Sequence, residues 1–295
     1  MKQKVALVLG SGGARGMAHI GVIHEILDRG CEITSVSGTS MGALIGAVYA
    51  TGRMDEFEKW LTSLSKLDVF NLVDFTLSKS GIIKADRVLK EMQSFIPDQN
   101  IEELPIKYSA VATNILNGQE EVFVKGSLYD AVRASISIPM VITPLKKNDT
   151  LFVDGGVLNP VPVNRIHRHE DDIMIAVNVN ANLPYNNNKN SRENSDKQFN
   201  DRLANGKLQR FKEQFAHLIS SDKKDSIGYF DLVSETSRLM LSQITRLTLE
   251  INPPDLLVEV SREACGTFDF YKASEMINLG RDMTKPALEN FSKCL

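Results

Sequence analysis

One serine of the 295-residue chain lies in a pattern typical of enzyme nucleophiles. The segment reads Gly38-Thr39-Ser40-Met41-Gly42. In many hydrolases the pattern G-x-S-x-G forms a sharp turn between a strand and a helix, which exposes the serine hydroxyl. Here a predicted short strand at 33–37 precedes the serine, and a stretch rich in alanine and glycine at 40–51 follows it. Ser40 is therefore a candidate nucleophile for acyl transfer, and the alternative is that its hydroxyl only caps the helix.

A second glycine-rich segment follows the first apolar stretch of the chain. It reads Gly10-Ser11-Gly12-Gly13-Ala14-Arg15-Gly16. Between a strand and a helix, the amides of such a turn converge on one point and bind an anion, either a phosphate or the oxyanion of a reaction intermediate. The dinucleotide pattern fails because Arg15 takes the place of its last glycine, and the segment lacks the Gly-Lys-Ser/Thr of the Walker pattern. We favour an oxyanion site over a purely structural turn.

A serine nucleophile needs a base, and no histidine stands out as one. The five histidines are His19, His24, His167, His169 and His217. The first two fit structural positions on the first predicted helix, and the other three fit solvated positions. Asp154 follows a short apolar strand and precedes Gly155-Gly156, which let the backbone turn sharply and bring a carboxylate into a crowded site. The alternative for Asp154 is an ordinary Asp-Gly turn.

Strands and helices alternate around these residues. The apolar run at 5–9 predicts a buried parallel strand, the helical spacing at 16–29 a helix, and residues 33–37 a second strand, which together form a βαβ unit. Asn117-Gly118 predicts a hairpin. Further strands are predicted at 107–113, 121–124, 151–153, 172–180 and 256–260, and further helices at 40–51, 54–65, 85–96, 128–135, 208–218, 229–249, 273–283 and 286–291. The alternation predicts a layered α/β fold.

The chain is predicted to form a single domain, residues 1–295. It comprises a catalytic core at about 5–180, an asparagine-rich mobile loop at about 184–205 and a helical part at 206–295. The apolar segment at 70–83 either belongs to the core or forms a lid that binds acyl chains.

Composition excludes several classes of function. With 34 basic and 37 acidic side chains the net charge is −3, which argues against a nucleic-acid partner. The three cysteines, Cys31, Cys265 and Cys294, fit a reducing compartment and lack metal-ligand spacing. No apolar run is long enough to span a membrane or to act as a secretory signal. We expect a cytoplasmic protein without metal or cofactor, whose membrane contact would be peripheral; its oligomeric state is not predicted.

Together these motifs resemble one family, the patatin-like phospholipases. The resemblance rests on the glycine loop at 11–16, the serine motif at 38–42 and the aspartate block at 154–156, in this order. The segment at 133–139 (Arg-Ala-Ser-Ile-Ser-Ile-Pro) also looks like the one that precedes the aspartate block in the family, so the likeness spans about 5–180. Ser11 stands where many members carry glycine.

The resemblance implies a layered α/β/α fold with a mainly parallel sheet, and a serine–aspartate dyad. Ser40 would be the nucleophile, Asp154 the base, and the amides of Gly12, Gly13 and Arg15 the oxyanion hole. Ser11, Gly16, Gly38, Gly42, Gly155 and Gly156 complete the family's motifs. The implied substrates are phospholipids or related acyl esters. The Arg15 side chain would either contact a headgroup phosphate or be solvated.

Two other functions remain open at this point. One is an α/β-hydrolase esterase whose triad is completed by His217, which follows Ser40 and Asp154 in the order that such triads require. The other is a lipid-sensing or regulatory protein that keeps the fold without catalysis.

Overall fold

A computed structural model describes residues 2–72, 86–97, 99–139, 141–185 and 229–291. Two units are distinguished within the chain. The first comprises Met1–Pro184 and Ile244–Leu295, and the second Tyr185–Gln243. Helix α9 (Tyr229–Ile251) begins in the second unit and ends in the first.

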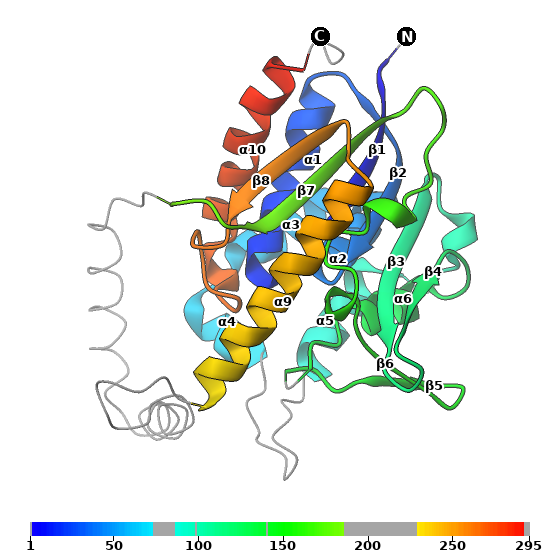
Figure 1. The fold of residues 1–295 in the computed structure, drawn as a ribbon, viewed down its shortest axis with the longest axis vertical. Helices are drawn as coiled ribbons and strands as arrows, with labels where there is room; N and C mark the ends of the chain where they lie inside the picture. The colour runs from blue at the N-terminus through cyan, green and yellow to red at the C-terminus, as the bar shows by residue number, and fades with distance from the viewer. Residues whose placement is uncertain (1, 73–85, 98, 140, 186–228, 292–295) are drawn as a thin grey trace. The chain divides into compact units, whose positions relative to one another are not determined.

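The first unit is built on a mixed, mostly parallel sheet (Figure 1). Its strands are β1 (Lys4–Leu9), β2 (Glu32–Thr39), β3 (Lys107–Asn114), β4 (Gln119–Phe123), β5 (Leu145–Lys147), β6 (Thr150–Asp154), β7 (Ile173–Ala181) and β8 (Leu256–Ser261). The order is β5-β6-β3-β2-β1-β7-β8, and β4 also pairs with β3. Strands β3, β2, β1, β7 and β8 are parallel to one another, whereas β4, β5 and β6 form antiparallel pairs.

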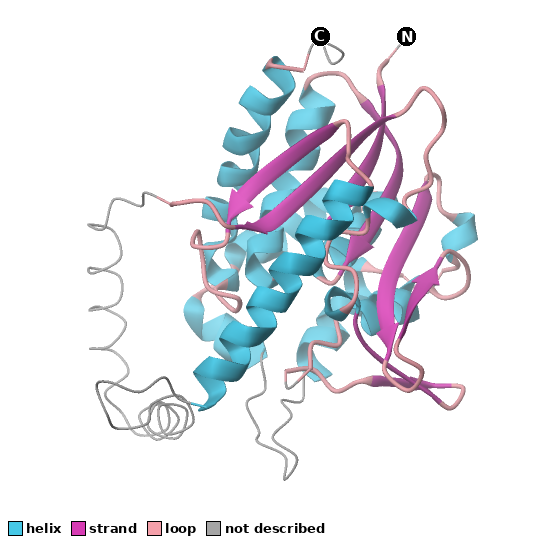
Figure 2. Ribbon diagram, viewed as in Figure 1, coloured by secondary structure: helices cyan, strands magenta, loops and turns pink. Residues whose placement is uncertain are grey.

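Helices cover the sheet (Figure 2). Those of the described residues are α1 (Ala18–Asp28), α2 (Met41–Ala50), α3 (Met54–Ser63), α4 (Lys66–Leu72), α5 (Asp86–Phe95), α6 (Leu128–Ser135), α9 and α10 (Ala273–Glu289). Helices α10, α1, α2 and α6 contact one another in this order along one face. On the other face Leu249 near the end of α9 packs against a buried apolar cluster that includes Val8, Val161 and Met174. The predicted layered α/β/α fold is confirmed.

The apolar run at 5–9 forms the centre of the core. Val5–Leu9 of β1 are completely buried, because β1 lies between β2 and β7 with layers above and below. A strand buried on both faces carries apolar residues at successive positions. The β3–β4 hairpin is also as predicted: Asn114 pairs with Gln119, and Gly118 takes φ 69° in the connecting loop.

Some element boundaries differ from the sequence predictions. The first helix begins at Ala18 instead of Gly16, because the chain first makes a 3-10 turn at Gly13–Met17. The two helices predicted at 273–283 and 286–291 are one helix, α10, which contains Pro286. Its extensive packing against α1 compensates for the hydrogen bond that proline cannot donate. Strand β5 and helix α4 were not predicted.

Several predictions fall outside the described residues. These are the helix at 208–218, most of the asparagine-rich loop at 184–205, and most of the apolar segment at 70–83. No helix within the described ranges is long and apolar enough to cross a lipid bilayer.

Candidate active site

Ser40 occupies a sharp turn between β2 and α2. Its backbone has φ 57° and ψ −122°, a left-handed conformation that is unusual for a residue other than glycine. Gly42 lets the start of α2 approach β1, because a Cβ on it would lie 2.0 Å from the carbonyl oxygen of Leu9. The strained turn and the close approach explain why the motif needs glycine beside the serine.

The Ser40 hydroxyl contacts the carboxylate of Asp154. Ser40 Oγ donates a hydrogen bond to Asp154 Oδ2 at 2.5 Å, although the two residues are 114 positions apart. Ser40 is 3% and Asp154 6% exposed. This is the geometry in which a carboxylate can take a proton from a hydroxyl.

The sheet explains why these two residues meet. Strands β2 and β4 both pair with Ala110 and Val111 of β3, so they occupy opposite edges of that strand. Strand β4 continues to pair with one edge of β3 as far as Asn114. Strand β6 therefore pairs with the opposite edge of β3, beyond the point where β2 ends. The last residue of β2, Thr39, pairs with Val111, and the last residue of β6, Asp154, pairs with Ala112. The two strands thus run toward each other along this edge of β3 and meet end to end.

Burial governs the electrostatics of Asp154. Desolvation raises the pKa of this carboxyl to about 6, against the opposing effect of hydrogen bonds from Ser40 and the amide of Gly156. The Gly156 amide lies 2.7 Å from Oδ1. Gly155 makes the tight turn possible, since a Cβ there would lie 2.1 Å from the carbonyl oxygen of Val111. Such a carboxylate is a stronger base than a solvated aspartate.

The glycine loop connects β1 to α1 and is held at several points. The amide of Ser11 donates to Pro160 O at 2.8 Å, and the amide of Ala14 donates to Thr267 O at 2.9 Å. Among the described residues, no hydrogen bond has the amide of Gly12 or Gly13 as its donor. These two amides therefore remain available to an anion. The Arg15 amide lies one turn into the 3-10 helix, where a carbonyl three residues earlier is the usual acceptor.

The Arg15 side chain is held by the protein. Its Nε and Nη2 donate to Asn180 Oδ1 at 3.1 and 2.8 Å, and its Nη1 donates to Cys265 O at 2.9 Å. Asn180 Nδ2 in turn donates to Ser11 O at 2.6 Å. Of the two alternatives for the Arg15 side chain, the solvated one is wrong, because the guanidinium is bound to Asn180 near the end of β7 and to Cys265 in the loop after β8.

None of the described histidines has a hydrogen bond or ion pair to Ser40 or Asp154. His19 is fully buried, its Nε2 lies 2.8 Å from Gly10 O, and burial lowers its pKa to about 4. Its Nδ1 is buried without a hydrogen-bond partner among the described residues. His24 pairs with Glu58, and His167 and His169 are exposed. His217 lies outside the described residues.

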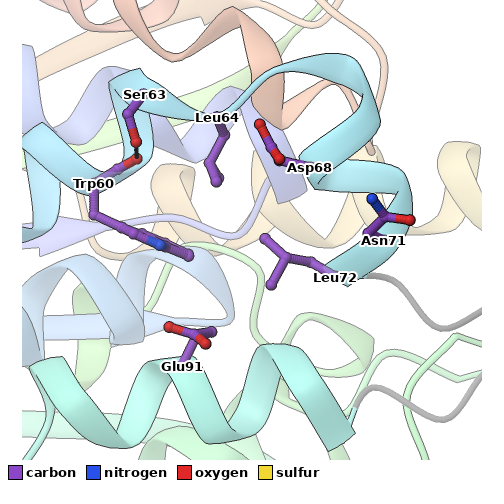
Figure 3. A pocket seen from close by; sticks show the side chains of 7 residues that line it. All are labelled: Trp60, Ser63, Leu64, Asp68, Asn71, Leu72 and Glu91. Atoms are coloured by element: carbon purple, nitrogen blue, oxygen red, sulfur yellow. Dashed lines mark hydrogen bonds between the residues drawn. The ribbon is translucent and has the colours of Figure 1, made fainter.

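A pocket of about 470 Å³ lies between α3, α4 and α5 (Figure 3). Its lining residues are Trp60, Ser63, Leu64, Asp68, Asn71, Leu72 and Glu91. Neither Ser40 nor Asp154 lines this pocket. In the described part of the chain, no three His, Cys, Asp or Glu side chains are grouped so that they could hold a metal ion.

Comparison with known proteins decides the family. A model of the patatin-like phospholipase family matches residues 7–166, more than half of the chain. The chain belongs to the patatin-like phospholipase family. Membership makes this patatin-like chain a carboxylic ester hydrolase, and confirms the resemblance drawn from the motifs.

Three known proteins are similar to this chain. An uncharacterised NTE family protein of Mycobacterium tuberculosis is 35% identical over 98% of this patatin-like chain and 92% of its own length. Lysophospholipase NTE1 of Yarrowia lipolytica is 30% identical over 61% of the chain and 13% of its own length. The crystal structure of VipD from Legionella pneumophila gives a TM-score of 0.47 at 16% identity, and covers 98% of this chain and 67% of that one.

Sequence reasoning missed three residues that contact the site. Ser135 lies in the segment at 133–139 that carries part of the family resemblance, but the resemblance does not indicate its contact with Ser40. Asn180 and Thr267 bind the glycine loop. No local pattern distinguishes these two, because an asparagine near the end of a strand or a carbonyl in a loop is common in any α/β protein.

Proposed function

We propose that this chain cleaves carboxylic ester bonds of phospholipids or related acyl lipids through a Ser40–Asp154 dyad. The observation that carries the proposal is the hydrogen bond between the Ser40 hydroxyl and the buried Asp154 carboxylate. The proposed substrate class rests on the family and on the lysophospholipase among its relatives. Contact with membranes would be peripheral, and a cytoplasmic location is part of the proposal.

In the proposed first step Ser40 Oγ attacks the ester carbonyl carbon while its proton passes to Asp154 Oδ2. The carbonyl oxygen becomes an oxyanion, which the amides of Gly12 and Gly13 would stabilise. The family resemblance implies the Arg15 amide as a further donor, but its position in the 3-10 turn favours a carbonyl acceptor within the turn. One oxyanion donor typically contributes about 100- to 1,000-fold in rate. Collapse of the intermediate returns the proton to the leaving alcohol and leaves an acyl group on Ser40.

The second step would release the acid. A water molecule attacks the acyl carbon and gives its proton to Asp154. The second oxyanion forms at the same amides, and its collapse transfers the proton back to Ser40 and frees the carboxylic acid. Because the pKa of an ordinary aspartate is far below that of an alcohol, this chemistry depends on the raised pKa of Asp154 and on the oxyanion donors.

The test compares the purified protein with its Ser40→Ala and Asp154→Asn variants. We expect each substitution to lower ester hydrolysis at least about 1,000-fold, as losses of nucleophile or base do in serine hydrolases. A fluorophosphonate probe should label the native protein and leave Ser40→Ala unlabelled. A panel of phospholipids, lysophospholipids and neutral esters, scored by released fatty acid, identifies the substrate class.

The same experiments test the two other functions. A lipid-sensing protein would bind vesicles without releasing fatty acid and without reacting with the probe. A triad with His217 predicts that His217→Ala is inactive, whereas the dyad predicts activity within about 3-fold of native. Near-native turnover in Asp154→Asn would refute the dyad.

A further inference from the structure

The segment at the end of α6 contacts both members of the dyad. The amide of Ser40 donates a hydrogen bond to Ser135 Oγ at 2.8 Å. Two residues later, the carbonyl oxygen of Ser137 accepts the amide of Asp154 at 2.9 Å. One short stretch of chain therefore binds the backbone of the nucleophile and the backbone of the base.

The hydroxyl of Ser135 has a fixed orientation. It donates to the carbonyl oxygen of Val111 at 2.6 Å and accepts from Ser40, so both of its hydrogen-bonding roles are used. Ser135 is completely buried. Without the hydroxyl, the buried amide of Ser40 and the buried carbonyl of Val111 would each lose a hydrogen-bond partner. A water molecule could take the place of the hydroxyl only in a cavity large enough to hold it.

The segment is anchored independently of the dyad. Arg133, which is 8% exposed, donates from Nη1 to Ser137 Oγ at 2.6 Å and from Nη2 to the carbonyl oxygen of Thr143 at 2.7 Å. Ser137 Oγ donates back to the carbonyl oxygen of Arg133 at 2.8 Å. These bonds fix the end of α6, so Ser135 offers Ser40 a rigid acceptor.

We propose that Ser135 is a positioning residue, whose hydroxyl holds the strained turn at Ser40 against β3 and so keeps Ser40 Oγ aligned with Asp154. Val111 links Ser135 to both ends of the site. It pairs with Thr39 beside Ser40, its carbonyl oxygen accepts the Ser135 hydroxyl, and the same carbonyl lies close to Gly155 beside Asp154. A left-handed serine persists only where its surroundings enforce that conformation. The hydroxyl touches no substrate in this proposal; it acts through the backbone of Ser40.

The proposal rests on the proposed function and predicts a specific kinetic effect. Small displacements of reacting groups lower the rate of the chemical step by up to about 100-fold. Loss of the Ser135 hydroxyl should therefore lower kcat by about 10- to 100-fold and slow the reaction with a fluorophosphonate probe. KM should change less than about 3-fold, because the loss falls on the chemical step and not on ester binding.

The experiment uses Ser135→Ala together with the isosteric pair Ser135→Thr and Ser135→Val, in the full chain. Threonine keeps the hydroxyl and valine replaces it by a methyl group, so their difference reports on the hydroxyl at equal bulk. We expect kcat of the threonine variant to exceed that of the valine variant at least about 10-fold. The comparison remains informative if Ser135→Ala does not fold.

Ser109→Ala is the matched control. Ser109 lies on β3, is 4% exposed, and its hydroxyl bonds with Ser37 Oγ at 2.8 Å and Arg165 O at 3.1 Å, away from the dyad. The kcat of the Ser109→Ala variant should stay within about 3-fold of the native value. Equal kcat in Ser135→Thr and Ser135→Val, or equal losses in Ser135→Ala and Ser109→Ala, would overturn the positioning role. If the native protein neither hydrolyses esters nor reacts with the probe, the proposed function itself fails.

Discussion

The amide of Gly156 donates a hydrogen bond of 2.7 Å to Oδ1 of Asp154, two positions earlier in the chain. Oδ2 of the same carboxylate accepts from Ser40 at 2.5 Å. Each oxygen thus has one donor, yet burial outweighs both, and the pKa of Asp154 rises to about 6. The carboxylate is a stronger base for this reason, and its protonation should be visible in both activity and stability.

Activity should follow the ionisation of Asp154. In the proposed mechanism Asp154 acts as a carboxylate base, so kcat/KM for an uncharged ester should rise with pH and reach half its maximum near pH 6. At about pH 5 it should be about 10-fold below the plateau, as expected for a single proton. The measurement is a pH–rate profile from about pH 4.5 to about pH 8.5, which covers both sides of this ionisation. A midpoint near the pKa of an ordinary aspartate would contradict the role of burial.

The Asp154→Asn variant should be inactive and more stable than the native protein at neutral pH. Because the folded-state pKa is raised above 3.8, folding favours the protonated acid, and native stability declines as pH rises through about 6. The side-chain amide of the Asp154→Asn variant does not ionise, so its folding carries no cost of burying a charge. We expect the substitution to add about 3 kcal/mol to the free energy of unfolding at about pH 7.5 and about half of that at about pH 5, measured by urea denaturation. A gain that is independent of pH would show that repacking, not ionisation, is responsible.

Asn180 should be needed to hold the glycine loop. Asn180→Asp keeps an acceptor for Arg15 but places a carboxylate against the carbonyl oxygen of Ser11, which now receives a hydrogen bond of 2.6 Å. The loop should shift, and kcat should fall about 10-fold or more with loss of an oxyanion donor. Asn117→Asp, in an exposed turn where the side chain only accepts, is the control and should remain near native. Equal activity of the two variants would refute a role for Asn180.

Gly155→Ala should destabilise the fold. A Cβ at this position would lie 2.1 Å from the carbonyl oxygen of Val111, in the backbone of an inner strand that cannot retreat. We expect a loss of about 1–3 kcal/mol or more, together with loss of activity. Gly266→Ala is the control, since a Cβ there meets only the side chain of Asp269, at 3.1 Å. Thermal unfolding of both variants measures the difference; similar midpoints would contradict the steric argument.

Local patterns determined much of this fold. The apolar run at 5–9, the helical spacing that follows it and Asn117-Gly118 indicate their structures through interactions between near neighbours. Boundaries were less accurate where packing overrides local preference, as in the unbroken α10 with its internal Pro286. The site motifs were recognisable because each is a short contiguous pattern, although Gly42 and Gly155 are required by the close approach of residues distant in sequence, Leu9 and Val111.

The G-x-S-x-G motif, the glycine loop after the first strand, the Asp-Gly-Gly block and the family resemblance that they carry can all be identified from the residues alone. The contact between Ser40 and Asp154, and the hydrogen bonds that Ser135 and Asn180 make to Ser40 and Ser11, are visible only in the folded chain. Ser40 and Asp154 touch because β2 and β6 meet end to end on one edge of β3. Pairing between distant strands depends on the whole sheet, and no short segment of the chain encodes it.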